Sequence, residues 1–389
     1  MNVAIVTSGI LPVPPVKGGA VENLVKFYLD YNEMQNTDVE FTVYSVFDEG
    51  FSNNTYQEYK KTTFVFINTH TFFSKIRQLL FKYTKRNLYY HHSWEYFVSE
   101  VSNKIKHERF DAIVVENRPG FVLRLSKCSD AKLMLHLHND MLNKDTKDAS
   151  EILKLYTKVL TVSNYIKERV DTIMSTDKVQ VVYNGIDLEK FKSPFHSEIN
   201  RKNFHLSEDD FVVVYTGRIE SVKGVKELLE AFSLLSDYEK IKLLIVGGGN
   251  GNINEGEFFS EMNELAFSMP EKVVFTGFQP YEKIPSILSF CDLAVVPSIW
   301  EDPFPTTVLE SLAAGLPLIV TRSGGIPEAV NEECAIFVNI DNNLPLNLSN
   351  AILSIYSDNN KKNRMSEYAV KHSILFSKEK YALAILKLL

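Results

Sequence analysis

The stretch Phe211–Gly249, FVVVYTGRIESVKGVKELLEAFSLLSDYEKIKLLIVGGG, decides the fold. It opens with a run rich in β-branched and aromatic residues, FVVVYTGRI, and closes with a second apolar run, KLLIVGGG. Between them, GVKELLEAFSLL carries apolar residues at the spacing of an amphipathic helix. A strand, a helix and another strand in this order predict parallel strands joined by a crossover helix.

The same alternation continues on both sides of this stretch. Further strands are predicted at VAIVTSG, FTVYSVF, DAIVVEN, KLMLHLH and VLTVS in the first half, and at KVVFTGF, DLAVVPS and PLIVT in the second. A polar segment without a clear period, which begins at Ser193, separates the halves. We therefore predict two doubly wound α/β domains, residues 1–193 and 194–370, facing each other across a cleft, followed by an amphipathic helix within 371–389.

Composition narrows the class of protein. The 389 residues are 45% apolar and 23% charged, as in ordinary globular proteins, and the net charge of −7 argues against nucleic acid as a partner. Cys128, Cys291 and Cys334 lie far apart, which favours reduced thiols over a disulfide framework or a zinc site. The first residues do not resemble a secretion signal, and no run of 18 apolar residues occurs. We expect a cytoplasmic protein.

Two cations follow the strand FVVVYT. Arg218 lies just after the strand and Lys223 just before the helix. Because ligands of such sheets bind at the carboxyl ends of strands, this pair suits a diphosphate, which arginine can grip with two hydrogen bonds and lysine with a point charge. A pair of solvated surface charges explains the segment equally well.

The segment EDPFPTTVLES offers a second anion site. Pro305 suits the start of a helix that Thr306 or Thr307 could cap, and free N–H groups there attract anions or sugar hydroxyls. Glu310 could accept hydrogen bonds from two ribose hydroxyls, although a solvated helix face is an equal alternative. Asp302 and Glu310 are too far apart along the chain to form the carboxylate pair of a glycosidase.

Other motifs argue against competing functions. In GGGNGN the third glycine of a dinucleotide fingerprint is replaced by Asn252, and no P-loop motif occurs. His136 and His138 alternate along one strand and so face the same side, with His138 at the strand's end. No HExxH or carboxylate-rich motif accompanies them, so we predict no metal site, and a structural histidine remains the simple alternative.

Five segments taken in order resemble one family. They are KGGAVEN, VVYNGID, GRIESVKGV, VVFTGF and DPFPTTVLESLAAGLPLIVTRSGGIPE. Their order is similar to that in the family 4 retaining glycosyltransferases of GT-B fold, and most similar to bacterial members, including the CotSA-like spore-coat group and polysaccharide enzymes. The resemblance covers both halves and is strongest from Val213 to Val330. It also implies that the helix within 371–389 packs back on the N-terminal domain.

The resemblance implies a role for residues of the second half. Glu310 would bind the nucleotide ribose, and Arg218 with Lys223 would hold the diphosphate. Backbone at Phe304, Pro305 and Thr306 would meet the donor sugar or phosphate. Backbone near Gly277 and Phe278 would read the base.

Other implied positions lie in the first half or depart from the family pattern. Gly18 and Gly19 resemble the loop that faces the donor phosphates and acceptor, and His138 resembles a histidine that contacts the donor sugar. Asp302 stands where many members carry glutamate, and its shorter side chain puts that contact in doubt.

The resemblance implies transfer of a hexosyl or N-acetylhexosaminyl group from a nucleotide sugar, expected to be UDP-linked, to a glycan or lipid-linked acceptor in surface polysaccharide or glycoconjugate synthesis. No cofactor is expected and the reaction is expected to be metal-independent. The alternatives are a non-catalytic glycosyltransferase-like accessory subunit, against which Arg218, Lys223 and Glu310 argue, and a GT-B sugar-nucleotide epimerase or phosphorylase.

One basic, aromatic segment stands apart from these motifs. FFSKIRQLLFKYTKRNLYYHHSW contains Lys75, Arg77, Lys82, Lys85 and Arg86 and no acidic residue. In an acidic protein this composition suits contact with a membrane surface, here the inner face of the cell membrane. A basic protein face with buried aromatic residues is an equal alternative.

Overall fold

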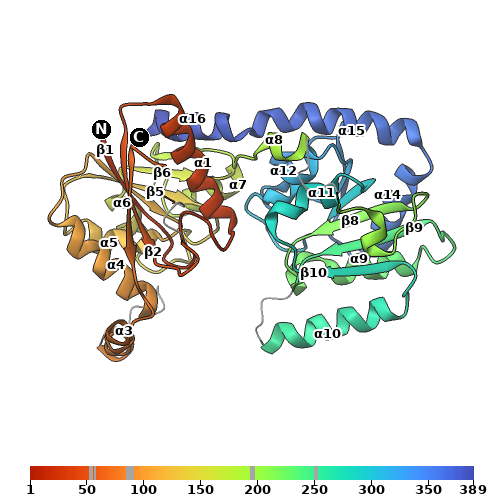
Figure 1. Ribbon diagram of the computed structural model, residues 1–389, viewed down its shortest axis with the longest axis horizontal. Coiled ribbons are helices and arrows are strands. Elements are labelled where there is room, and N and C mark those ends of the chain that lie inside the picture. Colours follow the sequence, from red (N-terminus) through yellow and green to blue (C-terminus); the bar gives the residue numbers. More distant parts are fainter. Residues whose placement is uncertain (52–55, 57, 85–91, 193–197, 249–252) are drawn as a thin grey trace. The chain divides into compact units, whose positions relative to one another are not determined.

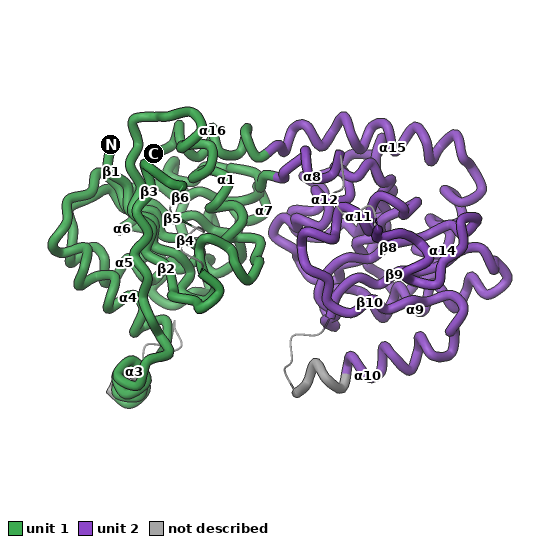
Figure 2. The backbone as a smooth tube through the Cα atoms, viewed as in Figure 1, with its two compact units in different colours: residues 1–185, 378–389 green, residues 186–377 purple. Residues whose placement is uncertain are grey.

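The computed structural model describes residues 1–51, 56, 58–84, 92–192, 198–248 and 253–389. The chain forms two compact units, residues 1–185 with 378–389 and residues 186–377 (Figure 2). The chain therefore passes from the first unit to the second at Gly185–Ile186, and returns at Ser377–Lys378. The sequence suggested a boundary near Ser193 and a returning segment that begins at residue 371.

Unit 1 is built on a parallel sheet. Among the described residues the sheet has seven strands in the order β3-β2-β1-β4-β5-β6-β7. They are β1 (Asn2–Val6), β2 (Glu40–Val46), β3 (Thr62–Ile67), β4 (Ala112–Glu116), β5 (Lys132–Leu137), β6 (Lys158–Thr161) and β7 (Val179–Val181). The order reverses between β1 and β4, which is where doubly wound sheets bind ligands.

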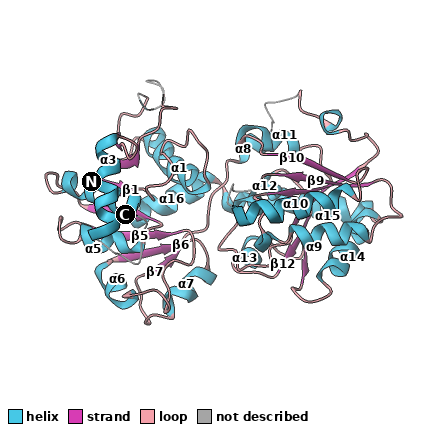
Figure 3. Cartoon of the chain, turned by 90° about the horizontal axis from the view of Figure 1, so that it is seen from below, coloured by secondary structure: helices cyan, strands magenta, loops and turns pink. Residues whose placement is uncertain are grey.

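Helices cover both faces of this sheet. They are α1 (Ala20–Gln35), α3 (Phe72–Thr84), α4 (His92–Ile105), α5 (Val122–Leu125), α6 (Ala149–Leu155), α7 (Asn164–Asp171) and α16 (Lys378–Leu388). Figure 3 shows the strands between α1 and α16 on one side and α6 and α7 on the other. Strand β4 is buried along its whole length, as expected for a central strand of a doubly wound sheet.

Unit 2 repeats the architecture with a second parallel sheet. Its described strands number six, in the order β10-β9-β8-β11-β12-β13. They are β8 (Phe211–Thr216), β9 (Ile241–Val246), β10 (Val273–Gly277), β11 (Leu293–Val296), β12 (Leu318–Thr321) and β13 (Ala335–Val338). The order reverses between β8 and β11. The predicted pair of doubly wound α/β domains is therefore confirmed.

In unit 2 most helices lie between successive strands along the chain, with α8 before the first strand and α14 and α15 after the last (Figure 1). They are α8 (Leu188–Lys192), α9 (Val225–Ser233), α10 (Ile253–Phe267), α11 (Ile284–Leu288), α12 (Thr306–Ala313), α13 (Ile326–Ala329), α14 (Leu344–Tyr356) and α15 (Asn359–Ser373). Their apolar faces enclose a core that includes Val213, Phe232 and Ile352.

Three strands were missed in the sequence, and one helix start was predicted wrongly. Strands β3, β7 and β13 each lie at the edge of a sheet and are only partly buried, so they lack the continuous burial of a central strand. Helix α12 begins at Thr306 and Pro305 is its cap residue, so Thr306 and Thr307 lie inside the first turn and do not cap it.

Candidate functional site

The ends of three neighbouring strands in unit 2 are made of glycine. Gly217, Gly247 and Gly277 follow or end β8, β9 and β10, and all three have positive φ angles. The N–H of Gly247 donates to the carbonyl of Gly277, and a Cβ on Gly247 would lie 1.8 Å from the carbonyl oxygen of Gly217. A side chain on Gly247 would therefore prevent the close approach of the ends of β8 and β9.

Gly277 and Phe278, predicted to lie near the base, border open space. A Cβ built on Gly277 meets no described atom within 4 Å, whereas its φ of +67° still favours glycine. The side chain of Phe278 is 79% exposed. An exposed aromatic ring beside an accessible backbone is suited to stacking against a planar ligand.

Arg218 and Lys223 follow β8 but have different environments. Arg218 is largely exposed, and its guanidinium donates to Glu220 at 2.6 Å. Lys223 is mostly buried, and its Nζ lies 2.5 Å from Oδ2 of Asp302 and 5.6 Å from the ring of Trp300. Gly224, at φ +72°, then packs so closely on Pro297 that a Cβ would lie 1.9 Å from the proline carbonyl oxygen.

The Lys223–Asp302 pair therefore bridges the point where the strand order reverses. Lys223 belongs to the loop after β8 and Asp302 to the loop after β11. The N–H groups of Ile299 and Trp300 both donate to the carbonyl of Val222, which joins the same two loops through the backbone. The sequence suggested separate ligand contacts for Lys223 and Asp302, whereas in the tertiary structure the two side chains contact each other.

The turn RSGGIPE supports Asp302 from the other side. The N–H of Gly325 donates to the carbonyl of Asp302 at 2.7 Å. A Cβ on Gly324 would lie 2.2 Å from that same carbonyl oxygen, so this turn requires glycine there. The backbone N–H of Gly324 also donates to the carboxylate of Glu301. The carboxylate of Glu301 therefore already has a hydrogen-bond partner in this turn.

Glu310 lies one turn inside α12 and is buried. Burial raises the pKa of its carboxyl to about 7, and a hydrogen bond with the side chain of Thr306 opposes the shift. Burial raises the pKa of the Tyr281 phenol, and the charges of Glu310 and Asp187 raise it further. A buried carboxylate without a cation as its main partner is a strong acceptor for ligand hydroxyls.

The side chain of Phe304 belongs to the core of unit 2. It is buried and its ring centroid lies 5.7 Å from that of Phe376. Any ligand contact of Phe304 therefore falls to its backbone, as the sequence suggested for this segment. The described α12 provides N–H groups at its first turn, which favour anions.

In unit 1, two histidines share one buried carboxylate. Glu116, the last residue of β4, pairs in register with His136 on β5. Its Oε2 lies 3.1 Å from Nδ1 of His136 and 3.0 Å from Nε2 of His138, and its Oε1 accepts from the hydroxyl of Tyr28 at 3.0 Å. Glu116 is 1% exposed. The prediction that both histidines face one side is confirmed.

The carboxylate fixes how His138 can act. An ionised carboxylate accepts hydrogen bonds, so Nε2 of His138 carries the proton. Burial and the neighbouring His136 lower the pKa of His138 to about 4, which leaves its Nδ1 as an acceptor at neutral pH. Within the described part of the chain, this buried Nδ1 has no hydrogen-bond partner. Burial opposes ionisation of Glu116, but the two histidines outweigh it and hold the Glu116 pKa below its usual range.

This trio also has the composition of a metal site. One ligand atom from each of Glu116, His136 and His138 lies within 4.8 Å of the others. Histidines that bind metals normally donate through their second nitrogen to a carboxylate or carbonyl. Here His136 Nε2 and His138 Nδ1 have no partner among the described residues, so a shared carboxylate explains the cluster better than a missing ion. The expected absence of a metal remains a prediction.

The loop before α1 contains the two predicted glycines. Gly18 and Gly19 have φ angles of +72° and +108°. A Cβ on Gly18 meets nothing within 4 Å, whereas one on Gly19 would lie 2.2 Å from the carboxylate of Glu22. Glu22 is buried at the start of α1, and burial raises its pKa to about 7. The loop thus combines open backbone with a carboxyl group that is readily protonated.

Glu116, Glu22 and Arg118 were not predicted as site residues from the sequence. Arg118 is buried, donates to the carbonyl of Ser8 at 3.2 Å and lies 3.8 Å over the ring of Trp94. A signal was present in DAIVVEN, because a carboxylate that ends a fully apolar central strand needs partners. The neighbouring strand supplied them in His136 and His138.

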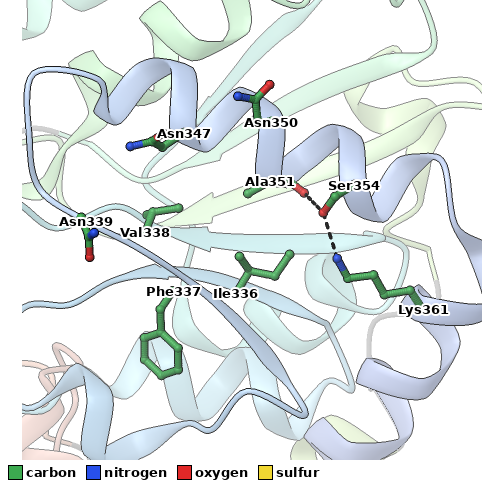
Figure 4. Close-up of a pocket in the computed structure, with 9 residues that line it drawn as sticks. All are labelled: Ile336, Phe337, Val338, Asn339, Asn347, Asn350, Ala351, Ser354 and Lys361. Atoms are coloured by element: carbon green, nitrogen blue, oxygen red, sulfur yellow. Dashed lines mark hydrogen bonds between the residues drawn. The ribbon is translucent and has the colours of Figure 1, made fainter.

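A separate cavity of about 480 Å³ lies between β13, α14 and α15 (Figure 4). Its lining includes Phe337, Asn347 and Lys361. The Nζ of Lys361 donates to the hydroxyl of Ser354 at 3.0 Å, which in turn donates to the carbonyl of Ala351. These polar groups already satisfy each other, and the residues predicted to bind a ligand are not among those lining the cavity.

Both units match known glycosyltransferase families. Residues 196–372 match the family described as glycosyl transferases group 1, and residues 32–190 match glycosyltransferase family 4. The putative glycosyltransferase YtcC of Bacillus subtilis is 26% identical over 387 residues, 96% of this chain and 87% of YtcC. Spore coat protein SA of the same organism is 24% identical, over 95% of this chain and 93% of its own.

A solved structure confirms the GT-B fold. The structure of HepE from Anabaena in complex with UDP-glucose aligns with a TM-score of 0.75, over 100% of this chain and 98% of HepE. The two sequences are 18% identical, so this likeness concerns the arrangement of the backbone.

Proposed function

Because the chain belongs to the family 4 glycosyltransferases, we propose that it transfers a sugar from a UDP-linked donor to a glycan or lipid-linked acceptor, with retention of anomeric configuration. The observation that carries the proposal is the meeting of Lys223 and Asp302 at the reversal point of the unit 2 sheet. Together with the resemblance, it supports a donor site at these strand ends.

Each group in unit 2 has a chemical task in this proposal. Arg218 and Lys223 hold the diphosphate, while the first N–H groups of α12 face the phosphate or sugar. Glu310 accepts hydrogen bonds from the ribose hydroxyls, and the ring of Phe278 lies against the base. Asp302 contacts the donor sugar and, before the donor binds, neutralises Lys223.

The proposed reaction breaks the bond between the anomeric carbon and the diphosphate oxygen. The acceptor hydroxyl oxygen forms its bond to the same face of that carbon, and its proton passes to the departing phosphate. Negative charge grows on the nucleoside diphosphate, so Arg218, Lys223 and the N-terminus of α12 stabilise the transition state more than the bound donor. On this proposal His138 contacts the donor sugar, and Gly18 and Gly19 approach the phosphates and acceptor.

The setting belongs to the proposal as well. We place the reaction in the cytoplasm at the inner face of the cell membrane, in surface polysaccharide or glycoconjugate synthesis. Lys75, Arg77 and Lys82 on α3 support a membrane contact. Lys85 and Arg86, which belong to the same predicted patch, lie outside the described residues. The described helices include none that combines the length and hydropathy needed to cross a bilayer.

Calorimetric titration with UDP in EDTA tests the donor site, with GDP and ADP as competing nucleotides. We expect micromolar binding of UDP that Arg218→Ala abolishes. The next step is a panel of UDP-sugars, in which UDP release with an acceptor and the product's anomeric configuration by NMR test transfer and retention.

Three other results would each replace the proposal. Folded protein that binds none of the three nucleotides would be an accessory subunit. Conversion of a UDP-sugar into its epimer without any acceptor would identify an epimerase. A pyridoxal absorbance band would identify a phosphorylase.

A further inference from the structure

Helix α3 exposes most of its large apolar side chains. Six of them are between 43% and 77% exposed: Phe72, Phe73, Ile76, Leu79, Leu80 and Tyr83. Figure 1 shows α3 at the edge of unit 1, beyond α4 and apart from the sheet. Contiguous apolar surface of this kind is rare on proteins without a partner for it.

These six side chains form a single face. At about 100° per residue they occupy an arc of roughly 120° around the helix axis. Ser74, which is 1% exposed, and the half-buried Gln78 lie on the opposite side. The polarity of the helix is therefore the reverse of that expected for a helix packed on a globular core.

Polar contacts hold the inner side of α3 to unit 1. The amide of Gln78 donates to the carbonyl of Thr69 at 2.7 Å. The guanidinium of Arg77 lies 2.5 Å from the carboxylate of Glu100 and 5.4 Å over the ring of Tyr96. These contacts fix the helix with its apolar face outward.

Charge indicates what covers that face. Lys75 and Lys82 are exposed and flank the apolar arc on one side, and the helix contains no acidic residue although the whole chain carries −7. Apolar residues bordered by lysines are typical of helices that lie in the interface of an anionic bilayer, where lysines reach the headgroups. Two copies of this chain paired through α3 would bring like charges together.

We propose that α3 inserts this apolar face into the surface of an anionic lipid bilayer. The inference deepens the membrane contact of the proposed function, because it assigns the affinity to side chains that enter the acyl boundary and not to basic charge alone. The affinity of α3 for a bilayer does not depend on the proposed function. The inference rests on that function only where it identifies the acceptor.

Flotation of the full chain with lipid vesicles tests the proposal. Vesicles of phosphatidylcholine with phosphatidylglycerol are compared with pure phosphatidylcholine. We expect the wild type to float with the anionic vesicles, and Phe72→Gln, Phe73→Gln and Leu80→Gln combined to weaken binding at least about 100-fold. Lys75→Gln and Lys82→Gln should each cost about five-fold and reduce the dependence on salt.

Matched controls use Phe267, the last residue of α10, which is 78% exposed. Phe267→Gln should leave flotation unchanged. For depth, Phe73→Trp should shift its fluorescence to the blue and be quenched by brominated lipid, whereas Phe267→Trp should not respond.

Three outcomes would overturn the proposal. In the first, the wild type does not float with anionic vesicles. In the second, flotation survives the triple substitution and disappears with the lysine substitutions, a result that indicates adsorption without insertion. Self-association without lipid that the triple substitution removes would assign the face to a second copy. UDP titration of the same proteins separates this result from the donor site: flotation without nucleotide binding would refute the proposed function and leave the inference about α3 intact.

Discussion

Nζ of Lys223 lies 2.5 Å from Oδ2 of Asp302, and this ion pair joins the loop after β8 to the loop after β11. Both side chains are largely buried. A diphosphate that approached Lys223 would compete with a carboxylate already in place. A substitution of Asp302 should therefore affect the affinity for the nucleotide and the contact with the sugar in different ways.

Asp302→Asn should tighten UDP binding about ten-fold, because it removes a negative charge beside the proposed diphosphate site. Sugar transfer should fall at least about ten-fold if Asp302 contacts the sugar. The free energy of unfolding should drop by about 1–3 kcal/mol, since Lys223 loses its partner. Calorimetry, turnover and urea unfolding measure the three effects, and weaker UDP binding would contradict this role for the pair.

Arg218→Ala should reduce transfer by about 10²–10³-fold, with little change in stability, because the side chain is 59% exposed. Lys240→Ala is the matched control. Lys240 is also exposed and pairs with a carboxylate, that of Asp209, but it directly precedes β9, whereas Arg218 follows β8. Equal losses of activity in the two variants would rule out a specific role for Arg218.

Glu310→Gln should stabilise the ligand-free protein at pH 8 and have little effect on stability at pH 4. The carboxyl releases its proton near 4.5 in the unfolded chain and near 7 in the folded one, so the folded state is penalised increasingly as pH rises through this window. The difference of about 2.5 pKa units corresponds to about 3 kcal/mol at pH 8. Thermal unfolding at both pH values provides the measurement.

UDP affinity should fall as pH drops below about 7, because Glu310 must lose its proton to accept from the ribose. Titrations in buffers of different ionisation enthalpy should detect proton release on binding at pH 6. In Glu310→Gln both the proton release and most of the affinity should disappear. A pH-independent affinity in the wild type would remove Glu310 from the ribose site.

Glu116→Gln should slow transfer about ten-fold while UDP affinity stays unchanged. The neutral amide no longer fixes the proton of His138 on Nε2, and nitrogen NMR of the imidazole should report a mixture of tautomers. Glu95→Gln is the control, since Glu95 is also buried in unit 1 and pairs with Arg124 at 3.4 Å. An unaltered His138 tautomer in Glu116→Gln would refute this positioning role.

Much of the fold was readable in the sequence because its strands are central. Segments such as FVVVYT and KLLIV are buried on both faces and therefore continuously apolar, which makes them easy to recognise. The edge strands β3, β7 and β13 are only partly buried and were not recognised. The start of α12 was misjudged because proline and threonine both suit several positions around a helix N-terminus.

The sequence by itself determined the two doubly wound sheets and the strand-end loops that carry Arg218, Lys223 and Asp302, since periodicity and loop position are local properties. Tertiary structure decided that Lys223 meets Asp302, that Glu116 joins His136 to His138, and that α3 turns its apolar side outward. Those contacts depend on which strands and helices become neighbours. Parallel sheets bring residues far apart in the chain to one edge, and a local pattern does not encode that meeting.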